Sequence, residues 1–294
     1  MNTTMWVGTQ FRCANEKIVD LGVFESMLAA MAYACGPLTL TDYFTCTTSG
    51  IGQQRSVSTP ENLVRLWNRK TTVELHLQSS RRMDDGPYAS VFFGRSDRPG
   101  GEVPPTSGEV TMYRTVSGDE HANFLLGLKR AFVLADGWSG HVHATTEGAF
   151  AYGENGFTSM RPWRRWDEDL PEIPLSERGK RSIFDRPPHA EDTNDRVELV
   201  RTVRSRVGPR VRGTYWGTLL GPALVEELGG LAGLIRDAPV VVAEPLGNGG
   251  AYLQLTPTPE PITTETMQRG LLALERFLQP VLVPTPPYWA TRTS

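Results

Sequence analysis

Apolar residues in this chain recur at two spacings, and each spacing predicts one kind of element. Between residues 71 and 77 every second residue is apolar, which is the period of a strand with one buried face. Two more short runs typical of strands follow at 88–93 and 109–116. Turn-forming segments with Gly and Pro separate the three runs, so we expect one antiparallel sheet from them.

Other segments carry apolar residues three and four positions apart, which is the spacing of one helix face. The helices predicted in this way cover 22–34, 119–135, 190–207 and 264–278, and a short helix starts at Thr59-Pro60. Asp119 stands at the start of the second helix, and we expect it to cap that helix. Further strands are predicted at 5–9, 38–47, 139–145, 149–153, 239–243 and 251–255. Of these, 139–145 and 149–153 are expected to form a hairpin, and 239–243 is expected to be buried.

The order of these elements indicates an α+β fold with antiparallel sheets flanked by helices. Strands occur in groups, and helices do not alternate strictly with them as they would in a doubly wound sheet. We expect an N-terminal α+β region over 1–153 and a C-terminal one over 189–294, joined by a long loop or linker over 154–188 that has no periodicity. Both regions run helix, strand, strand, helix in places, so two similar halves could make up the fold.

The stretch from Arg210 to Gly230 is predicted to be a strand that turns into a short helix. Tyr215 and Trp216 are adjacent, so on a strand they would face opposite sides, and at least one should be buried against the 264–278 helix. Pro222 suits the first turn of the helix that follows. Gly229 and Gly230 can adopt the left-handed conformation that ends it.

This stretch also carries a resemblance to a known family. The run from Trp216-Gly217-Thr218 to Leu228-Gly229-Gly230 resembles the signature segment of bacterial type VI secretion immunity proteins, which protect against polymorphic toxins. The resemblance covers about the last third of the chain. It implies a cytoplasmic protein without enzymatic activity that binds a cognate protein toxin and occludes the toxin's active site.

Composition narrows the function classes. The chain has 294 residues, 39% of them apolar and 21% charged, which is typical of a globular protein with a sizeable core. A net charge of -3 gives no basic surface for nucleic acid. Cys13, Cys35 and Cys46 show no C-x-x-C spacing, so we expect no zinc site or disulfide framework, and no cofactor or metal.

No apolar run is long enough to span a membrane, and the first residues have no basic segment followed by an apolar one. We therefore expect neither a membrane partner nor a signal peptide, and a cytoplasmic location. The oligomeric state is open.

The segment 161–171 alternates Trp, Arg and acidic residues. Trp and Arg are the residue types most enriched at binding hot spots, and nearby carboxylates can steer a basic partner. We therefore predict a partner-binding surface there; the alternative is a loop whose two Trp rings cover the core. Its residues are Trp163, Arg164, Arg165, Trp166, Asp167, Glu168 and Asp169.

An enzyme is the alternative from another class. His141 and His143 would point the same way from a strand and could bind a metal with His121 or His189, or they could be two half-exposed strand histidines. A hydrolase site could be formed by Asp136, Ser139 and His141, although three residues so close in sequence seldom form a catalytic triad. Asp167, Glu168 and Asp169 could hold a divalent cation or form a solvated turn. A small-molecule-binding module is a third class.

Overall fold

The computed structural model describes most of the chain on either side of a long central gap. The described residues are 5–13, 20–36, 40–47, 52–56, 59–68, 72–79, 88–95, 106–145, 210–211, 214–260 and 264–282. Within these ranges, no helix has the length and apolar character needed to cross a membrane.

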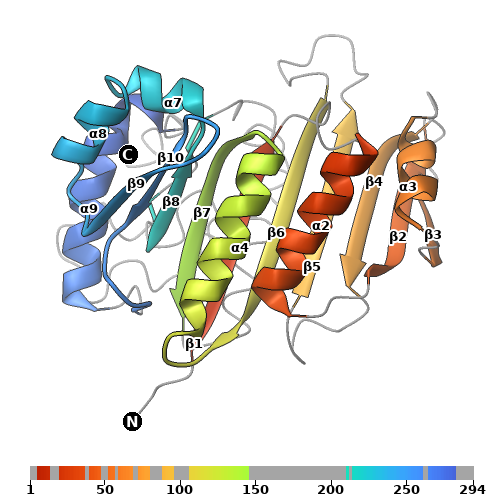
Figure 1. The fold of residues 1–294 in the computed structure, drawn as a ribbon, viewed down its shortest axis with the longest axis horizontal. Coiled ribbons are helices and arrows are strands. Elements are labelled where there is room, and N and C mark those ends of the chain that lie inside the picture. Colours follow the sequence, from red (N-terminus) through yellow and green to blue (C-terminus); the bar gives the residue numbers. More distant parts are fainter. Residues whose placement is uncertain are drawn as a thin grey trace, which may run out of the picture.

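One antiparallel sheet of ten strands organises the described residues (Figure 1). The strands lie in the order β3-β2-β4-β5-β6-β1-β7-β8-β10-β9, and every neighbouring pair is antiparallel. Their bounds are β1 Met5–Cys13, β2 Leu40–Thr47, β3 Gly52–Ser56, β4 Thr72–Ser79, β5 Tyr88–Arg95, β6 Thr106–Val116, β7 Gly137–Thr145, β8 Gly217–Leu220, β9 Val242–Pro245 and β10 Ala251–Gln254. With its flanking helices, this sheet confirms the predicted α+β fold and the predicted antiparallel pairing of β4, β5 and β6.

Strands from both ends of the chain share the sheet. The N-terminal strand β1 lies between β6 and β7, and β7 pairs with β8, which follows the central gap in the sequence. The second strand of the hairpin expected for 139–145, which is 149–153, lies outside the described residues. The segments 154–188 and 190–207 lie outside them as well.

Six α-helices flank the described sheet. They are α2 Leu21–Cys35, α3 Pro60–Trp67, α4 Glu120–Leu134, α7 Pro222–Glu227, α8 Leu231–Asp237 and α9 Glu265–Leu278, followed by the 3-10 turn η2 Gln279–Val281. Figure 1 shows α2 and α4 side by side over one face of the middle of the sheet, and α7, α8 and α9 gathered around the end that contains β8, β10 and β9.

The described helices that apolar spacing predicted form where expected, with one exception at a cap; α8 was not predicted. Thr59 and Thr264 accept a hydrogen bond from the backbone N–H three residues on, at 3.3 Å each. Asp119 makes no such bond; the expected cap is wrong there. Instead the Glu120 carboxylate accepts from the backbone N–H and the hydroxyl of Ser117, both at 2.9 Å, because this longer side chain can reach back over the helix start.

A close crossing joins α2 to α4. A Cβ on Gly127 would lie 2.7 Å from both the Ala30 carbonyl oxygen and the Ala34 backbone nitrogen. Only a glycine allows two backbones to approach so closely. The crossing places the buried faces of both helices in one core with the apolar face of the sheet.

Two strands at the C-terminal end differ from expectation. The strand predicted over 210–217 begins only at Gly217, and the strand predicted as buried over 239–243 is β9, a half-buried edge strand. Val241, just before it, is 58% exposed. An apolar run of this length has the same pattern in a buried strand and in an edge strand, so the pattern alone did not distinguish them.

Candidate functional site

The central strands β1 and β7 present polar side chains on the face of the sheet away from α4. On the α4 side, a Cβ on Gly140 would meet Phe11, whose ring packs edge-on against Phe132 of α4 at 5.4 Å. Side chains alternate along a strand, so Gln10 and His141, which are register partners, lie on the opposite face. We call this polar set, Gln10, Ser139, His141 and His143, the β7 polar cluster.

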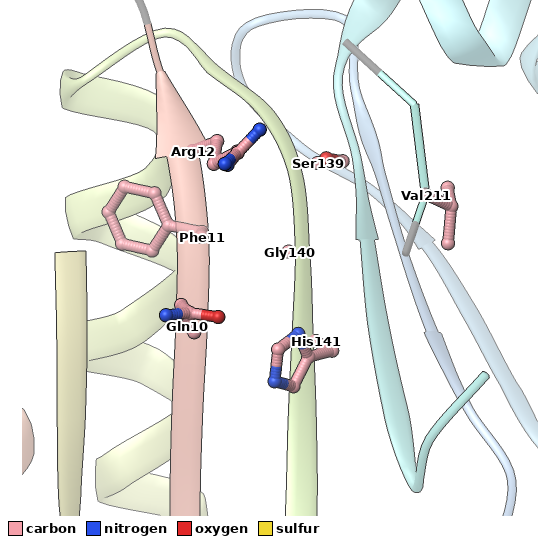
Figure 2. Close-up of a pocket in the computed structure, with 7 residues that line it drawn as sticks. All are labelled: Gln10, Phe11, Arg12, Ser139, Gly140, His141 and Val211. Carbon is pink, nitrogen blue, oxygen red and sulfur yellow. The ribbon is translucent and has the colours of Figure 1, made fainter. Parts of the chain in front are cut away.

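The β7 polar cluster is buried, and a small cavity among the described residues adjoins it. The cavity is lined by Gln10, Phe11, Arg12, Ser139, Gly140, His141 and Val211 (Figure 2) and has a volume of about 10 Å³. That is room for about one water molecule. Ser139 closes one side of it, because its hydroxyl donates a 2.8 Å hydrogen bond to the Arg210 carbonyl oxygen.

His141 and His143 lie on the same face, as predicted, but they are buried and not half-exposed. Their rings are 6.0 Å apart, and the His141 ring stacks on Tyr215 with ring centres 4.0 Å apart and planes at 16°. Burial lowers the pKa of His143 to about 4, because a charged imidazolium loses its hydration there. His143 is therefore neutral at pH 7.

The arrangement does not provide a catalytic triad. The Ser139 hydroxyl donates a hydrogen bond to a backbone carbonyl. A nucleophilic serine would instead donate a hydrogen bond to a histidine. Asp136 lies in the turn between α4 and β7 with a φ of 51°. The three residues thus have separate local roles, and the hydrolase interpretation finds no support in their geometry.

Of the two histidines proposed as a third metal ligand, the described one, His121, lies away from His141 and His143. His121 lies on α4, where its Nδ1 is 3.0 Å from the Gly118 carbonyl oxygen and its ring packs against Trp216. His189 lies outside the described residues, and among those described no three His, Cys, Asp or Glu side chains are grouped as a metal site requires. The β7 polar cluster thus brings together two histidines and no complete ligand set.

We predict that replacing His141 and His143 together by Ala leaves the metal content of the purified protein unchanged. Two imidazoles, one of them stacked on a tyrosine, are a poor zinc site without further ligands. Elemental analysis of both proteins checks this. A stoichiometric zinc signal that disappears in the double variant would revive the enzyme alternative.

Tyr215 and Trp216 are both buried, which is more than the sequence predicted. Trp216 is fully enclosed, and its Nε1 donates to the backbone oxygen of Thr256 at 3.1 Å and to that residue's hydroxyl at 3.0 Å. The same hydroxyl lies 3.8 Å from the sulfur of Met267 on α9. Trp216 is therefore tied to the segment that leads into α9 and packs against α4 as well.

The glycines of this stretch have conformational and steric roles. A Cβ on Gly217 would lie 2.7 Å from the Tyr252 hydroxyl, so β8 and β10 can pair closely only without a side chain there. Gly229 and Gly230 have φ values of 91° and 85°, the left-handed conformation predicted for the end of α7. These glycines therefore have structural roles in the pairing of β8 with β10 and at the end of α7.

The predicted partner-binding residues cannot be placed. Trp163, Arg164, Arg165, Trp166, Asp167, Glu168 and Asp169 lie outside the described residues. Their role stays a prediction.

Comparison with known proteins bears on the segment that contains the Tyr215-Trp216 motif. Residues 195–288 match the TsiV family model, described as type VI immunity for VRR-NUC. The match confirms the resemblance that was predicted from Trp216-Gly217-Thr218 and Leu228-Gly229-Gly230. The comparison with curated proteins found no match.

A solved structure extends the likeness beyond the TsiV-like segment. Pseudomonas aeruginosa T6SS protein PA0821 aligns with a TM-score of 0.50 and 10% identity, over 97% of this chain and 77% of that one. At so low an identity the likeness shows a shared fold alone. It covers the N-terminal strands as well as the TsiV-like segment.

Helix α4 contacts the TsiV-like segment through the side chain of Lys129. Lys129 of α4 lies 2.5 Å from the Glu244 carboxylate of β9 and 5.2 Å from the centre of the Tyr252 ring of β10. Burial, and the Glu244 charge to a smaller extent, raise the pKa of Tyr252 well above its usual value. Tyr252 is therefore neutral, and its hydroxyl donates a 3.1 Å hydrogen bond to the side-chain oxygen of Gln254.

Proposed function

We propose that this protein is an immunity protein that binds a cognate type VI toxin and neutralises it by occluding the toxin's active site. The match of residues 195–288 to the TsiV family carries this proposal. The buried β7 polar cluster agrees with it, since a protein that acts by occlusion needs a rigid scaffold.

The partner we propose is a nucleic-acid-degrading toxin of the VRR-NUC kind named in the family description. Such a toxin needs a basic cleft to bind phosphates, and an inhibitor can block the cleft with carboxylates. The place of this inhibition would be the cytoplasm, where the cell's own nucleic acid lies.

The segment 161–171 is our proposed contact with that cleft. Trp163 and Trp166 can bury large areas at little cost in side-chain entropy. Arg164 and Arg165 add donors, and the run Asp167-Glu168-Asp169 supplies the charge that a basic cleft attracts.

Replacing Asp167, Glu168 and Asp169 together by Ala is expected to slow toxin association by about 10-fold at low salt. The salt dependence of the association rate should also flatten, because those charges steer the encounter. Replacing Trp166 by Ala should instead speed dissociation, since an anchor acts after encounter and costs about 2 kcal/mol when lost. Stopped-flow or surface-based kinetics with the purified pair separates the two effects.

A control variant on α7 makes this test decisive. Replacing Glu226 by Ala removes an exposed carboxylate of α7 and should leave the kinetics unchanged. Unaltered toxin protection by both loop variants would place the interface elsewhere. A wild-type chain that neither binds nor protects against a VRR-NUC toxin encoded beside it would end the immunity proposal itself.

A further inference from the structure

Helix α2 has an outer face that is unusually poor in charge. Among its 15 residues Glu25 is the only charged one, whereas the 14-residue α9 carries four charged residues, Glu265, Arg269, Glu275 and Arg276. A helix that packs on a sheet with one face and meets water with the other should be polar on the outer side. The outward positions of α2 instead include Ala29 and Tyr33, both exposed.

The adjoining face of α4 continues this apolar surface. Tyr33 is 54% exposed and Leu126 is 55% exposed, and these are two of the four large apolar side chains that the described residues expose. The Tyr33 hydroxyl reaches Asn123 at 3.4 Å, one helical turn from Leu126. Ala122 is exposed beside them. We call this surface, Ala29, Tyr33, Ala122 and Leu126, the α2–α4 face.

The relative direction of α2 and α4 determines which end of the helix pair Glu25 and Arg130 occupy. Tyr33, near the C-terminal end of α2, meets Asn123, near the N-terminal end of α4. Earlier in α2, Ala30 meets Gly127, later in α4. The helices therefore run antiparallel, and Glu25 of α2 lies at the same end of the pair as Arg130 of α4, both exposed.

We propose that the α2–α4 face is the interface of a homodimer with two-fold symmetry. If the symmetry axis runs along the helices, α2 of one copy faces α4 of the other. Each Glu25 is then opposite the partner's Arg130, and Tyr33 is opposite the end of the partner's α4 that carries Asn123 and Leu126. Glu25 and Arg130 are thus complementary across the two-fold axis, as a symmetric interface requires.

The small number of carboxylates on α2 disfavours the toxin as the partner that covers the α2–α4 face. A cleft that binds nucleic acid is basic, and one carboxylate on α2 offers it little attraction. A second copy offers an apolar surface on which each Glu25 meets the opposite charge of the partner's Arg130. This inference stands without the proposed function, because it uses only the burial and sequence of the two helices.

Sedimentation of the full-length protein at micromolar concentrations tests the proposal. We expect a dimer for the wild type, and a dissociation constant raised by about 30-fold or more in the double variant Tyr33→Asp/Leu126→Asp, because central apolar anchors carry most of an interface's energy. Ile235→Asp is the matched control, since Ile235 on α8 is also an exposed apolar side chain but lies away from this face. It should leave the dimer intact, and thermal melts should show that all variants fold.

A charge exchange tests the symmetry. Glu25→Arg and Arg130→Glu should each weaken the dimer by about 10-fold, and the two together should restore it, since the pair recurs twice in a two-fold interface. A monomeric wild type, equal loss in the Ile235→Asp control, or no restoration by the exchange would each overturn the proposal. A monomer whose toxin complex is lost in the Tyr33→Asp/Leu126→Asp variant would assign the face to the toxin instead.

Discussion

Replacing Trp216 by Ala is expected to lower the free energy of unfolding by about 3–5 kcal/mol, the range for removing a large buried aromatic side chain. The ring is fully enclosed, so its loss leaves a cavity that the surrounding backbone cannot fill by collapse. Its Nε1 also donates two hydrogen bonds to Thr256, which follows β10 by two residues. The loss therefore loosens the TsiV-like segment where it meets α4.

Urea denaturation of the wild type and the variant measures this change. Trp216→Phe is the control, because it keeps most of the volume and removes only the indole donor; we expect it to cost about 1–2 kcal/mol. A Trp216→Ala variant as stable as the wild type would mean that the ring is not a core element, and the structural role of the motif would have to be abandoned.

The elements that sequence reasoning predicted well are those whose stability is decided locally. In α9, the residues Met267, Leu271, Leu274 and Leu278 repeat at helical spacing and are all buried. Thr264 caps that helix from the predicted position. Helical periodicity and capping depend on residues a few positions apart, so a single sequence contains the information.

The packing of Tyr215 and Trp216 shows where a regular pattern misleads. On a strand, adjacent residues face opposite sides, so only one of the two needed to be buried. The backbone at 214–216 is not in a strand, and both rings are enclosed, with Tyr215 on His141 and Trp216 against His121. The irregular backbone lets both faces of the sheet be covered by one short segment.

The burial of the β7 polar cluster could not be predicted, because its cover comes from far along the chain. His141 stacks on Tyr215, and Ser139 bonds to Arg210. Both partners follow the long segment that separates the halves of the sequence. Such long-range pairing depends on which strands meet in the sheet, and alternation within β7 contains no sign of it.

The pairing of distant strands was missed for the same reason. β1 lies between β6 and β7, and β8 lies between β7 and β10; a strand's own sequence indicates which face is apolar but not which neighbour it takes. The proposed partner-binding loop at 161–171 remains a hypothesis based on composition, since its residues lie outside the described ones.

Stability is expected to fall as the pH is lowered from about 6.5 to about 4, and His143 is expected to be the main cause in this window. Its pKa in the folded protein is about 4, lowered from 6.5 by burial. Between these values the unfolded chain binds a proton that the folded protein does not, so acid favours unfolding. The stability contribution is complete above pH 6.5, falls through the window, and levels off below the folded pKa.

The difference between the two pKa values corresponds to a loss on the order of 3 kcal/mol across the window. Urea denaturation at several pH values, for the wild type and for His143→Gln, measures it. The variant carries no titrating imidazole at that position, so its stability should be nearly flat between pH 6.5 and pH 4.5. Exposed carboxylates whose pKa values are lowered by hydrogen bonds, such as that of Glu120, begin to lose their contribution as the pH falls to the usual carboxylate pKa. Both proteins share this loss, so it cancels when the wild type is compared with the variant. If the wild type and the variant lost stability in parallel, the proton would be taken up elsewhere, and His143 would have to be better hydrated than its burial between β1 and β8 indicates.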